Sequence, residues 1–169
     1  EYLAQKALKR SKNFNWDIAS SLIINECEKL SHDSKISLTE NKNNTVNLGL
    51  VTTWGIDCGI AIYSKHLVDA LSKIGTQVTV LTEHDTPETD DNASIVRCWR
   101  RGQSLDELLN TISELKLNLV NIQHHPAFFR NDELSIFLWR LKEKNIPAIV
   151  TFHEIEPNQP NAIYLVPDN

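Results

Sequence analysis

The chain has 169 residues, of which 41% are hydrophobic and 23% are charged, and its formal net charge is −5. This length accommodates one compact domain and little more, and the composition is ordinary for a soluble globular protein. The negative charge argues against a nucleic-acid-binding protein, which usually presents a basic face.

Other features of the composition favour the cytoplasm. Cys27, Cys58 and Cys98 are far apart, odd in number and without a CxxC pair, which favours reduced thiols over a disulfide scaffold. No apolar run approaches the roughly 18 residues that span a bilayer. We therefore expect a cytoplasmic protein, and attachment to a membrane surface through a basic or amphipathic patch stays open.

The two ends of the sequence indicate a fragment of a longer protein. The chain begins at Glu1 without an initiator methionine, and its first residues lack the layout of a signal peptide. It ends at Asn169 in a stretch that is expected to be a loop. We expect part of a larger fold, which carries only part of a site.

Residues 1–31 are expected to form a helical segment. Tyr2–Arg10 is rich in Ala, Leu, Lys and Gln, which favour helices. A second helix is expected over 15–30, because apolar residues recur at helical spacing after the N-cap candidate Asn15. Residues 32–44 are polar and are expected to form a linker.

Residues 45–169 are expected to form the main domain. Short apolar runs alternate there with amphipathic segments, which predicts right-handed crossovers and a parallel sheet covered by helices on both faces. The predicted fold class is α/β, a Rossmann-like doubly wound parallel sheet with an N-terminal helical extension. Strands are expected at 46–52, 77–81, 94–99, 117–123 and 146–152, and helices at 60–74, 104–115 and 131–144.

Capping residues mark the ends of the predicted helices. Gly75 stands where the first helix needs a left-handed residue. Ser104 is expected to cap the second helix, with Glu107 three residues later to complete a capping box. Asn131 or Asp132 is expected to open the third helix.

Ligands bind beyond the carboxyl ends of the strands in sheets of this kind. Three segments, 53–59, 123–129 and 153–157, are expected at that edge. In the first, Gly55 and Gly59 let the backbone approach a ligand, and the N–H groups that open the next helix favour an anion such as a diphosphate. A turn whose glycines serve no ligand is the alternative.

A nicotinamide-binding domain is a second alternative for this turn. The spacing of the glycines is not GxGxxG, and no acidic residue closes the second predicted strand. Glu83 and Asp85 lie slightly beyond that strand, so this alternative stays open.

The second segment contains two adjacent histidines, His124 and His125, followed by Pro126. Both rings cannot point into the core, so one is expected to face a ligand as a hydrogen-bond partner. Surface histidines without a ligand are one alternative. A metal site that adds His153 is another, but no HxH or HExxH spacing supports it.

The third segment places His153 before Glu154, a pair suited to sugar hydroxyls because histidine donates or accepts and a carboxylate accepts. Capping of the strand without a ligand is the alternative. Arg97, Arg100 and Arg101 form a basic cluster that could clamp a phosphate, although a solvated loop is favoured.

Three sequence landmarks occur in order along this domain. They are Cys58–Ser64 (CGIAIYS), Val120–Pro126 (VNIQHHP) and Ala148–Glu154 (AIVTFHE). They resemble the glycine loop CGIAxYS, the strand segment hxHxP and the strand vvTxHD/E of the N-terminal domain of family 4 glycosyltransferases, which have the GT-B fold. In that family Glu is more frequent where this chain has His125.

The resemblance implies roles for the matched positions. The residues of the glycine loop, Gly55, Cys58, Gly59 and Ile60, would lie near the donor diphosphate. His124 would act beside the acceptor and the transferred sugar. The acceptor pocket would be lined by His125, His153 and Glu154. Family members of this type usually need no metal, so no cofactor is expected beside the nucleotide diphosphate sugar, which is the donor substrate.

The resemblance also implies partners. In the family, the nucleotide sugar is bound mostly by a C-terminal domain through an ExxxxxxxE pair, and this spacing does not occur in the chain. The expected partners are a nucleotide sugar, a sugar or lipid-linked acceptor and the missing C-terminal domain. The chain alone is expected to be inactive or nearly so.

The N-terminal segment carries a resemblance of its own. Asn13–Ala19, with the expected helix that follows it, looks like the tail that closes a GT-B enzyme. This implies a parent protein with two transferase modules in tandem. An ordinary helical extension is the alternative.

The predicted activity is transfer of a hexose from a nucleotide diphosphate sugar to an acceptor hydroxyl, with retention at the anomeric carbon. Backbone N–H groups near Gly59 would stabilise the leaving-group charge, and His124 would orient the acceptor or the sugar. The alternatives are a non-catalytic glycan- or partner-binding Rossmann-like module and a nicotinamide-dependent oxidoreductase domain.

Overall fold

The computed structural model describes residues 46–89 and 93–154, together with Ser21. The helices expected in the first 31 residues, the linker at 32–44 and the end of the chain after Glu154 lie outside the described residues, apart from Ser21.

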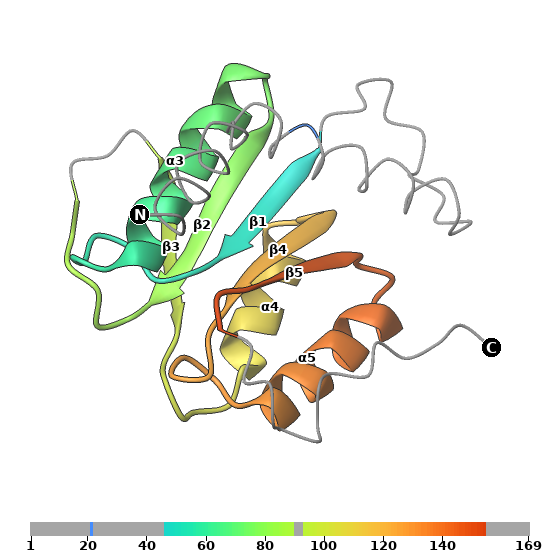
Figure 1. Ribbon diagram of the computed structural model, residues 1–169. Helices are drawn as coiled ribbons and strands as arrows, with labels where there is room; N and C mark the ends of the chain where they lie inside the picture. Colours follow the sequence, from blue (N-terminus) through green and yellow to red (C-terminus); the bar gives the residue numbers. More distant parts are fainter. Residues whose placement is uncertain (1–20, 22–45, 90–92, 155–169) are drawn as a thin grey trace, which may run out of the picture.

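Within the described residues, five strands form one parallel sheet in the order β3-β2-β1-β4-β5 (Figure 1). The α/β fold class and the Rossmann-like doubly wound sheet predicted from the sequence are therefore confirmed. The strands are β1 (Asn47–Val51), β2 (Gln77–Glu83), β3 (Ser94–Trp99), β4 (Leu119–His124) and β5 (Ala148–Phe152).

Helices cover both faces of this sheet. Helix α3 (Gly59–Lys73) packs on one face, while α4 (Asp106–Glu114) and α5 (Asn131–Glu143) pack on the other (Figure 1). This division follows from the right-handed crossovers that join parallel strands, since the order of the strands reverses between β1 and β4.

Alternation along β1 shows how the sheet has two apolar faces. Leu48 and Leu50 belong to the core cluster that contains Leu67 of α3. Val51 belongs to the cluster on the other face, which contains Leu108 of α4. Successive side chains of a strand point to opposite faces, so a central parallel strand needs apolar residues at every position.

Helix α3 begins one residue earlier than predicted, and its ends follow capping rules. Cys58 is its N-cap, with extended backbone, and its Sγ accepts a hydrogen bond of 3.4 Å from the N–H of Ala61. After Lys73 the chain turns through Gly75, whose φ of +86° is the left-handed conformation that glycine adopts without strain.

The predicted cap of α4 is wrong. The helix begins at Asp106 rather than directly after Ser104, and Leu105 occupies the N-cap position with its side chain buried. The Ser104 hydroxyl accepts from the N–H of Asp106 at 3.2 Å. Glu107 completes no capping box, because its carboxylate bonds the His84 ring at 2.9 Å.

Strand β2 extends two residues beyond its predicted end. Thr82 and Glu83 are polar, which suggested a loop, but both are buried and pair with Arg97 and Trp99 of β3. Glu83 therefore closes the second strand, contrary to the expectation that no acidic residue does so. Strand β4 is likewise displaced, so that His124 is its last residue.

No helix within the described residues is both long enough and apolar enough to cross a membrane.

Candidate functional site

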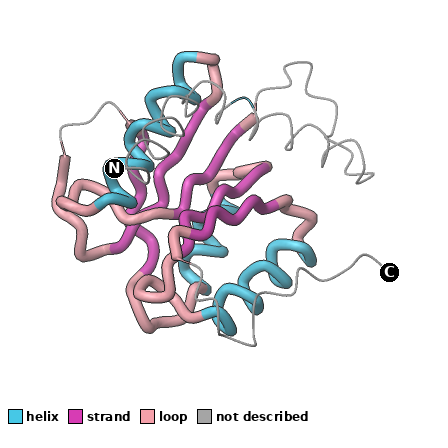
Figure 2. Tube along the Cα trace, in the orientation of Figure 1, coloured by secondary structure: helices cyan, strands magenta, loops and turns pink. Residues whose placement is uncertain are grey.

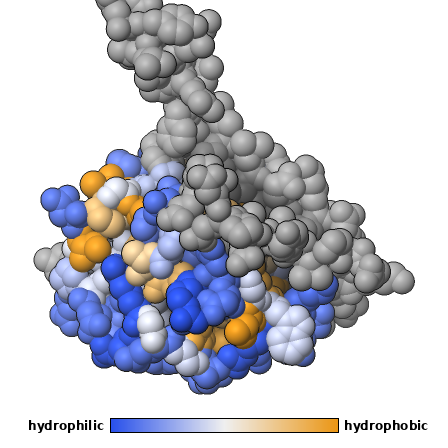
Figure 3. Space-filling view, turned by 60° about the horizontal axis from the view of Figure 1, so that its bottom comes forward, coloured by the Kyte–Doolittle hydropathy of each residue, from blue (hydrophilic) through white to orange (hydrophobic). Residues whose placement is uncertain are grey.

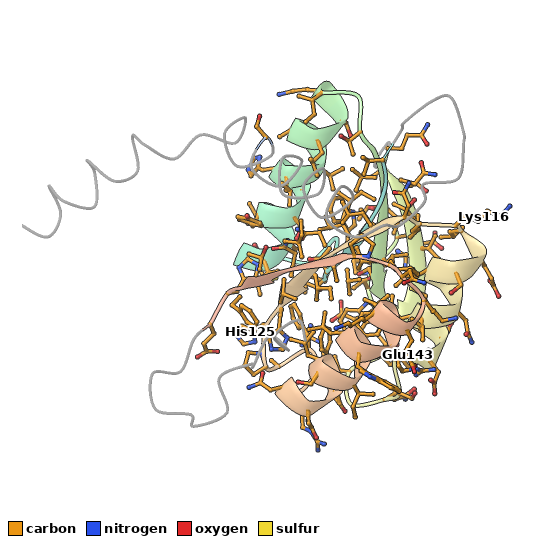
Figure 4. The ribbon with its side chains drawn as sticks, turned by 90° about the vertical axis from the view of Figure 1, so that its right-hand side faces the viewer. Lys116, His125 and Glu143 are labelled. Atoms are coloured by element: carbon orange, nitrogen blue, oxygen red, sulfur yellow. The ribbon has the colours of Figure 1, made fainter. Side chains whose placement is uncertain are left out.

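The site predicted from the sequence lies at one edge of the sheet. Strands β1, β4 and β5 are parallel neighbours, so the residues that follow them lie at the same edge. Loops gather there in Figure 2, and Figure 4 shows His125 on the opposite side of the molecule from Lys116, which precedes β4. The edge also contains the switch point between β1 and β4, where ligands bind in such sheets.

Gly55 and Gly59 serve different purposes in the turn after β1. Gly55 has a φ of +69°, and a Cβ added to it would lie 2.6 Å from Cγ2 of Thr89. The fold itself therefore requires glycine at this position. A Cβ added to Gly59 would meet nothing within 4 Å, so the folding of the described residues gives no reason for glycine there.

The first turn of α3 has the features of an anion site. The N–H groups of Gly59 and Ile60 make no hydrogen bond with other described residues, whereas that of Ala61 is bonded to Cys58. The turn has no acidic residue. These N–H groups lie at the positive end of the helix dipole, which favours a negatively charged ligand.

A cavity of about 160 Å³ adjoins this turn. Two polar residues that the sequence analysis did not select, Lys65 and Thr89, line it together with five others. The Thr89 hydroxyl is shielded from solvent and has no partner among the described residues. The other lining residues are Trp54, Gly55, Ile56, Ala61 and Ile62.

His124 faces α5 rather than the glycine turn. Its Nε2 lies 3.0 Å from Oδ1 of Asn131, and its ring contacts Phe129 and Phe152 at centroid distances of 5.3 and 5.5 Å. Only 1% of the residue is exposed. Burial lowers the pKa of His124, and the bond to Asn131 opposes this effect, so the ring favours the neutral form.

His153 lies on the opposite face of the sheet, toward α3. Its Nε2 donates to Oε1 of Gln123 at 2.7 Å, and its ring stands edge-on to Tyr63 at a centroid distance of 5.2 Å. Burial lowers the pKa of His153, and the nearby His125 and His124 lower it further. A neutral imidazole held in this way exchanges hydrogen bonds with hydroxyl groups.

His125 and Glu154 form a pair at the same edge. Nε2 of His125 lies 3.0 Å from Oε2 of Glu154, while its Nδ1 accepts from the N–H of Ala127 at 3.0 Å. Both side chains are partly exposed. The structure thus brings the three predicted acceptor residues to the same edge, since His153 comes directly before Glu154.

Polar residues on β4 and β5 connect these groups. Asn121 and Gln123 are buried on the α3 side of β4, and the Gln123 amide bonds both Asn121 Oδ1 and, at 3.4 Å, the Thr151 hydroxyl. Asn121 and Gln123 could have been identified from the sequence, because they are polar residues at alternate positions of a strand that is otherwise apolar on both faces. Tyr63 gave no such signal, because its contact with His153 depends on the packing of α3.

The arginines of the predicted basic cluster are bonded to the end of β2 and to the loop after it. Arg97 donates to the carbonyl of Thr86 at 3.1 Å, and Arg100 pairs with Asp85. Arg101 donates to Glu83 Oε1 at 2.7 Å. These contacts join β3 and the loop after it to the end of β2 and the loop that follows, and they support the view that the cluster is not a phosphate clamp.

No group of three or more His, Cys, Asp or Glu side chains is placed to hold a metal ion in the part of the chain that the structure describes. The three histidines proposed as an alternative metal site are separated, because His124 and His153 lie on opposite faces of the sheet.

Figure 3 turns the bottom of the molecule in Figure 1 toward the viewer. Where its residues are not drawn in grey, this face carries mostly hydrophilic side chains, with apolar side chains in patches between them.

No known protein family, curated protein or solved structure matches this chain. The function is therefore inferred from the residues of the site and from the sequence motifs.

Proposed function

We propose that this domain is the acceptor-side half of a retaining GT-B glycosyltransferase. It would transfer a hexose from a nucleotide diphosphate sugar to an acceptor hydroxyl. The observation that carries the proposal is the meeting of the three motif-bearing segments at one edge of the sheet, where His153 bridges Gln123 of β4 and Tyr63 of α3.

The donor diphosphate would lie over the first turn of α3. The N–H groups of Gly59 and Ile60 offer two hydrogen-bond donors, and the open space at Gly59 lets a phosphate oxygen approach the backbone. Lys65 lines the adjoining cavity and supplies a positive charge. Charge that develops on the leaving diphosphate would be stabilised by these fixed groups.

The acceptor would lie over the ends of β4 and β5. His153 and Glu154 offer a neutral imidazole and a carboxylate, which together donate to and accept from neighbouring hydroxyls. His125 fixes the Glu154 carboxylate at 3.0 Å. His124 lies on the opposite face of the sheet from His153, so in this proposal it orients the end of β4 and does not act as a nucleophile.

Nuclear magnetic resonance titration of the chain tests the donor half of the proposal. UDP and GDP should shift the amide signals of Gly59, Ile60 and Ala61, and NAD serves as the comparison. Gly59→Ala should weaken this response several-fold, because the added methyl occupies the space next to the backbone. Ser72→Ala, at the far end of α3, is the matched control.

Two other outcomes have defined meanings. A response to NAD alone, centred on Glu83 at the end of β2, would support the oxidoreductase alternative. A response to neither nucleotide diphosphate, with the fold intact, would remove the donor site from this domain.

Transfer itself is expected to need a second domain, so turnover is measured in the parent protein. His153→Gln should lower kcat strongly, while His66→Gln on the exposed side of α3 should leave it unchanged. Unchanged turnover in the His153 variant would contradict the proposed acceptor site.

A further inference from the structure

Three buried polar atoms at the edge of the sheet have no hydrogen-bond partner among the described residues. They are Oγ1 of Thr53, Oε2 of Glu83 and Nδ1 of His124. The three residues are 0%, 4% and 1% exposed, respectively. Because buried polar groups in native proteins are almost always paired, each such atom requires an explanation.

The three residues lie side by side across the sheet. Val51 of β1 is in register with Leu81 of β2 and with Ile122 of β4. Glu83 and His124 are two positions further along β2 and β4, and Thr53 lies two positions after Val51, beyond the end of β1. Thr52 continues the ladder, with its N–H donating to the carbonyl of Leu81 at 3.1 Å, and neighbouring strands are about 4.8 Å apart.

All three side chains point to the face covered by α4 and α5. Thr52 bonds Ser64 of α3 at 2.6 Å, and Trp54 belongs to the core on that side. Thr53, between them, therefore faces the other side. Glu83 and His124 share this face, because Leu81 and Ile122, two residues earlier, belong to the core cluster there.

Thr53, Glu83 and His124 form a row across the sheet, and aromatic side chains connect its two outer members, Glu83 and His124. Glu83 is bonded to Arg101, whose guanidinium lies 4.9 Å from the centre of the Phe128 ring. His124 contacts Phe129. Both phenylalanines pack on Trp99, at centroid distances of 6.1 and 5.8 Å. Glu83 and His124 are therefore connected through one aromatic cluster on this face of the sheet.

The hydrogen-bonding capacity of the row is well defined. Oδ1 of Asn131 only accepts, so Nε2 of His124 carries the proton and Nδ1 is an acceptor. Oε2 of Glu83 is also an acceptor, and the Thr53 hydroxyl both donates and accepts. A water molecule donates two hydrogen bonds and also accepts, so it satisfies both acceptors and the Thr53 hydroxyl, whereas an alcohol hydroxyl carries one proton and would leave one acceptor unpaired, and an anion would be repelled by the carboxylate.

We propose that Thr53, Glu83 and His124 form a buried site that binds one water molecule between them. A buried water typically makes about three hydrogen bonds, which is the number that these three atoms offer.

Thr53→Val tests the site in the ligand-free chain, because valine keeps the shape of threonine and removes the hydroxyl. If the hydroxyl bonds a bound group, the variant should lower the folding equilibrium constant about fivefold. If the hydroxyl has no partner, the variant should be as stable as the wild type or more so. Thr52→Val, which loses the bond to Ser64, is the positive control for a lost hydroxyl.

Water contact at the Thr53 methyl group gives a second, independent measurement. The ligand-free chain should show a nuclear Overhauser signal between this methyl and a water molecule that tumbles with the protein. The signal should persist on addition of UDP-glucose or GDP-mannose, because a sugar hydroxyl could pair with only one of the two acceptors.

A stable Thr53→Val variant together with no water signal would overturn the proposal. Both readings come from the ligand-free chain, so they do not depend on glycosyl transfer. Failure of the nucleotide titrations would therefore leave this site standing, and failure of the site would leave the transferase proposal standing.

Discussion

Tyr63 of α3 stands edge-on to His153 at the end of β5, with 5.2 Å between the ring centroids and an interplanar angle of 80°. The two residues are far apart in the sequence, and the contact ties the first helix of the sheet to its last described strand. It also orients the imidazole whose Nε2 donates to Gln123.

We expect the ring of Tyr63, more than its hydroxyl, to hold this arrangement. Tyr63→Leu should therefore be about 1 kcal/mol less stable than Tyr63→Phe, which keeps an aromatic edge against His153. Urea denaturation of the two variants measures the difference. Equal stability would show that the ring contact contributes nothing beyond apolar burial.

The fold was predicted from the sequence because its signals are local. Apolar runs and amphipathic segments alternate along the chain, and this alternation alone specifies a parallel sheet with helices on both faces. The end of β2 was missed because Thr82 and Glu83 are polar, and only their pairing with β3 holds them in a strand.

The site could be predicted only to the level of segments. The parallel topology brings the glycine turn, His124 and His153 to one edge, as the sequence indicated. The direction of each side chain depends on strand register, which the sequence did not fix, so His124 and His153 face opposite sides. Thr53 and Glu83 carry no motif, and their role is visible only from their place in the row.

Two histidines, of which His124 is buried and His153 is partly buried, make the stability of the chain sensitive to acid. Burial lowers the folded-state pKa of both His124 and His153, so below about pH 6.5 the unfolded chain binds protons that the folded chain does not. The contribution of these two histidines to the free energy of unfolding should therefore be fully present above that pH and should decrease as the pH falls from there to the lowered pKa values.

Urea titrations from pH 8 downward measure this loss. His153→Gln should flatten the dependence in part, and Ser72→Ala, which changes no titratable group at an exposed position of α3, should leave it as in the wild type. A wild-type stability that does not change between neutral and mildly acidic pH would contradict the lowered pKa values.

The two glycines of the turn after β1 should respond differently to alanine. Gly55→Ala places an alanine in the left-handed conformation, with its Cβ 2.6 Å from Thr89 Cγ2. The free energy of unfolding should therefore fall by about 1–2 kcal/mol or more. Gly59→Ala enters open space at the start of a helix, where alanine is favoured by up to about 1 kcal/mol. Thermal or urea denaturation separates them, and comparable losses in both variants would refute the assignment.

The buried Glu83 makes its pairing with Arg101 more important than a surface ion pair. The side chain of Glu83 is 5% exposed, and one of its oxygens accepts from Arg101. Arg101→Met keeps an apolar stem over Phe128 but leaves the carboxylate without its charged donor, so we expect a loss of about 2 kcal/mol.

Arg100→Met is the matched control for that loss. Arg100 pairs with Asp85 one position earlier in the same loop, but the side chains are 41% and 77% exposed, and such pairs contribute about 0–1 kcal/mol. Urea denaturation of both variants gives the comparison. If the two losses were equal, burial of Glu83 would not distinguish the pairs, and the carboxylate would have to reach solvent or another donor when Arg101 is removed.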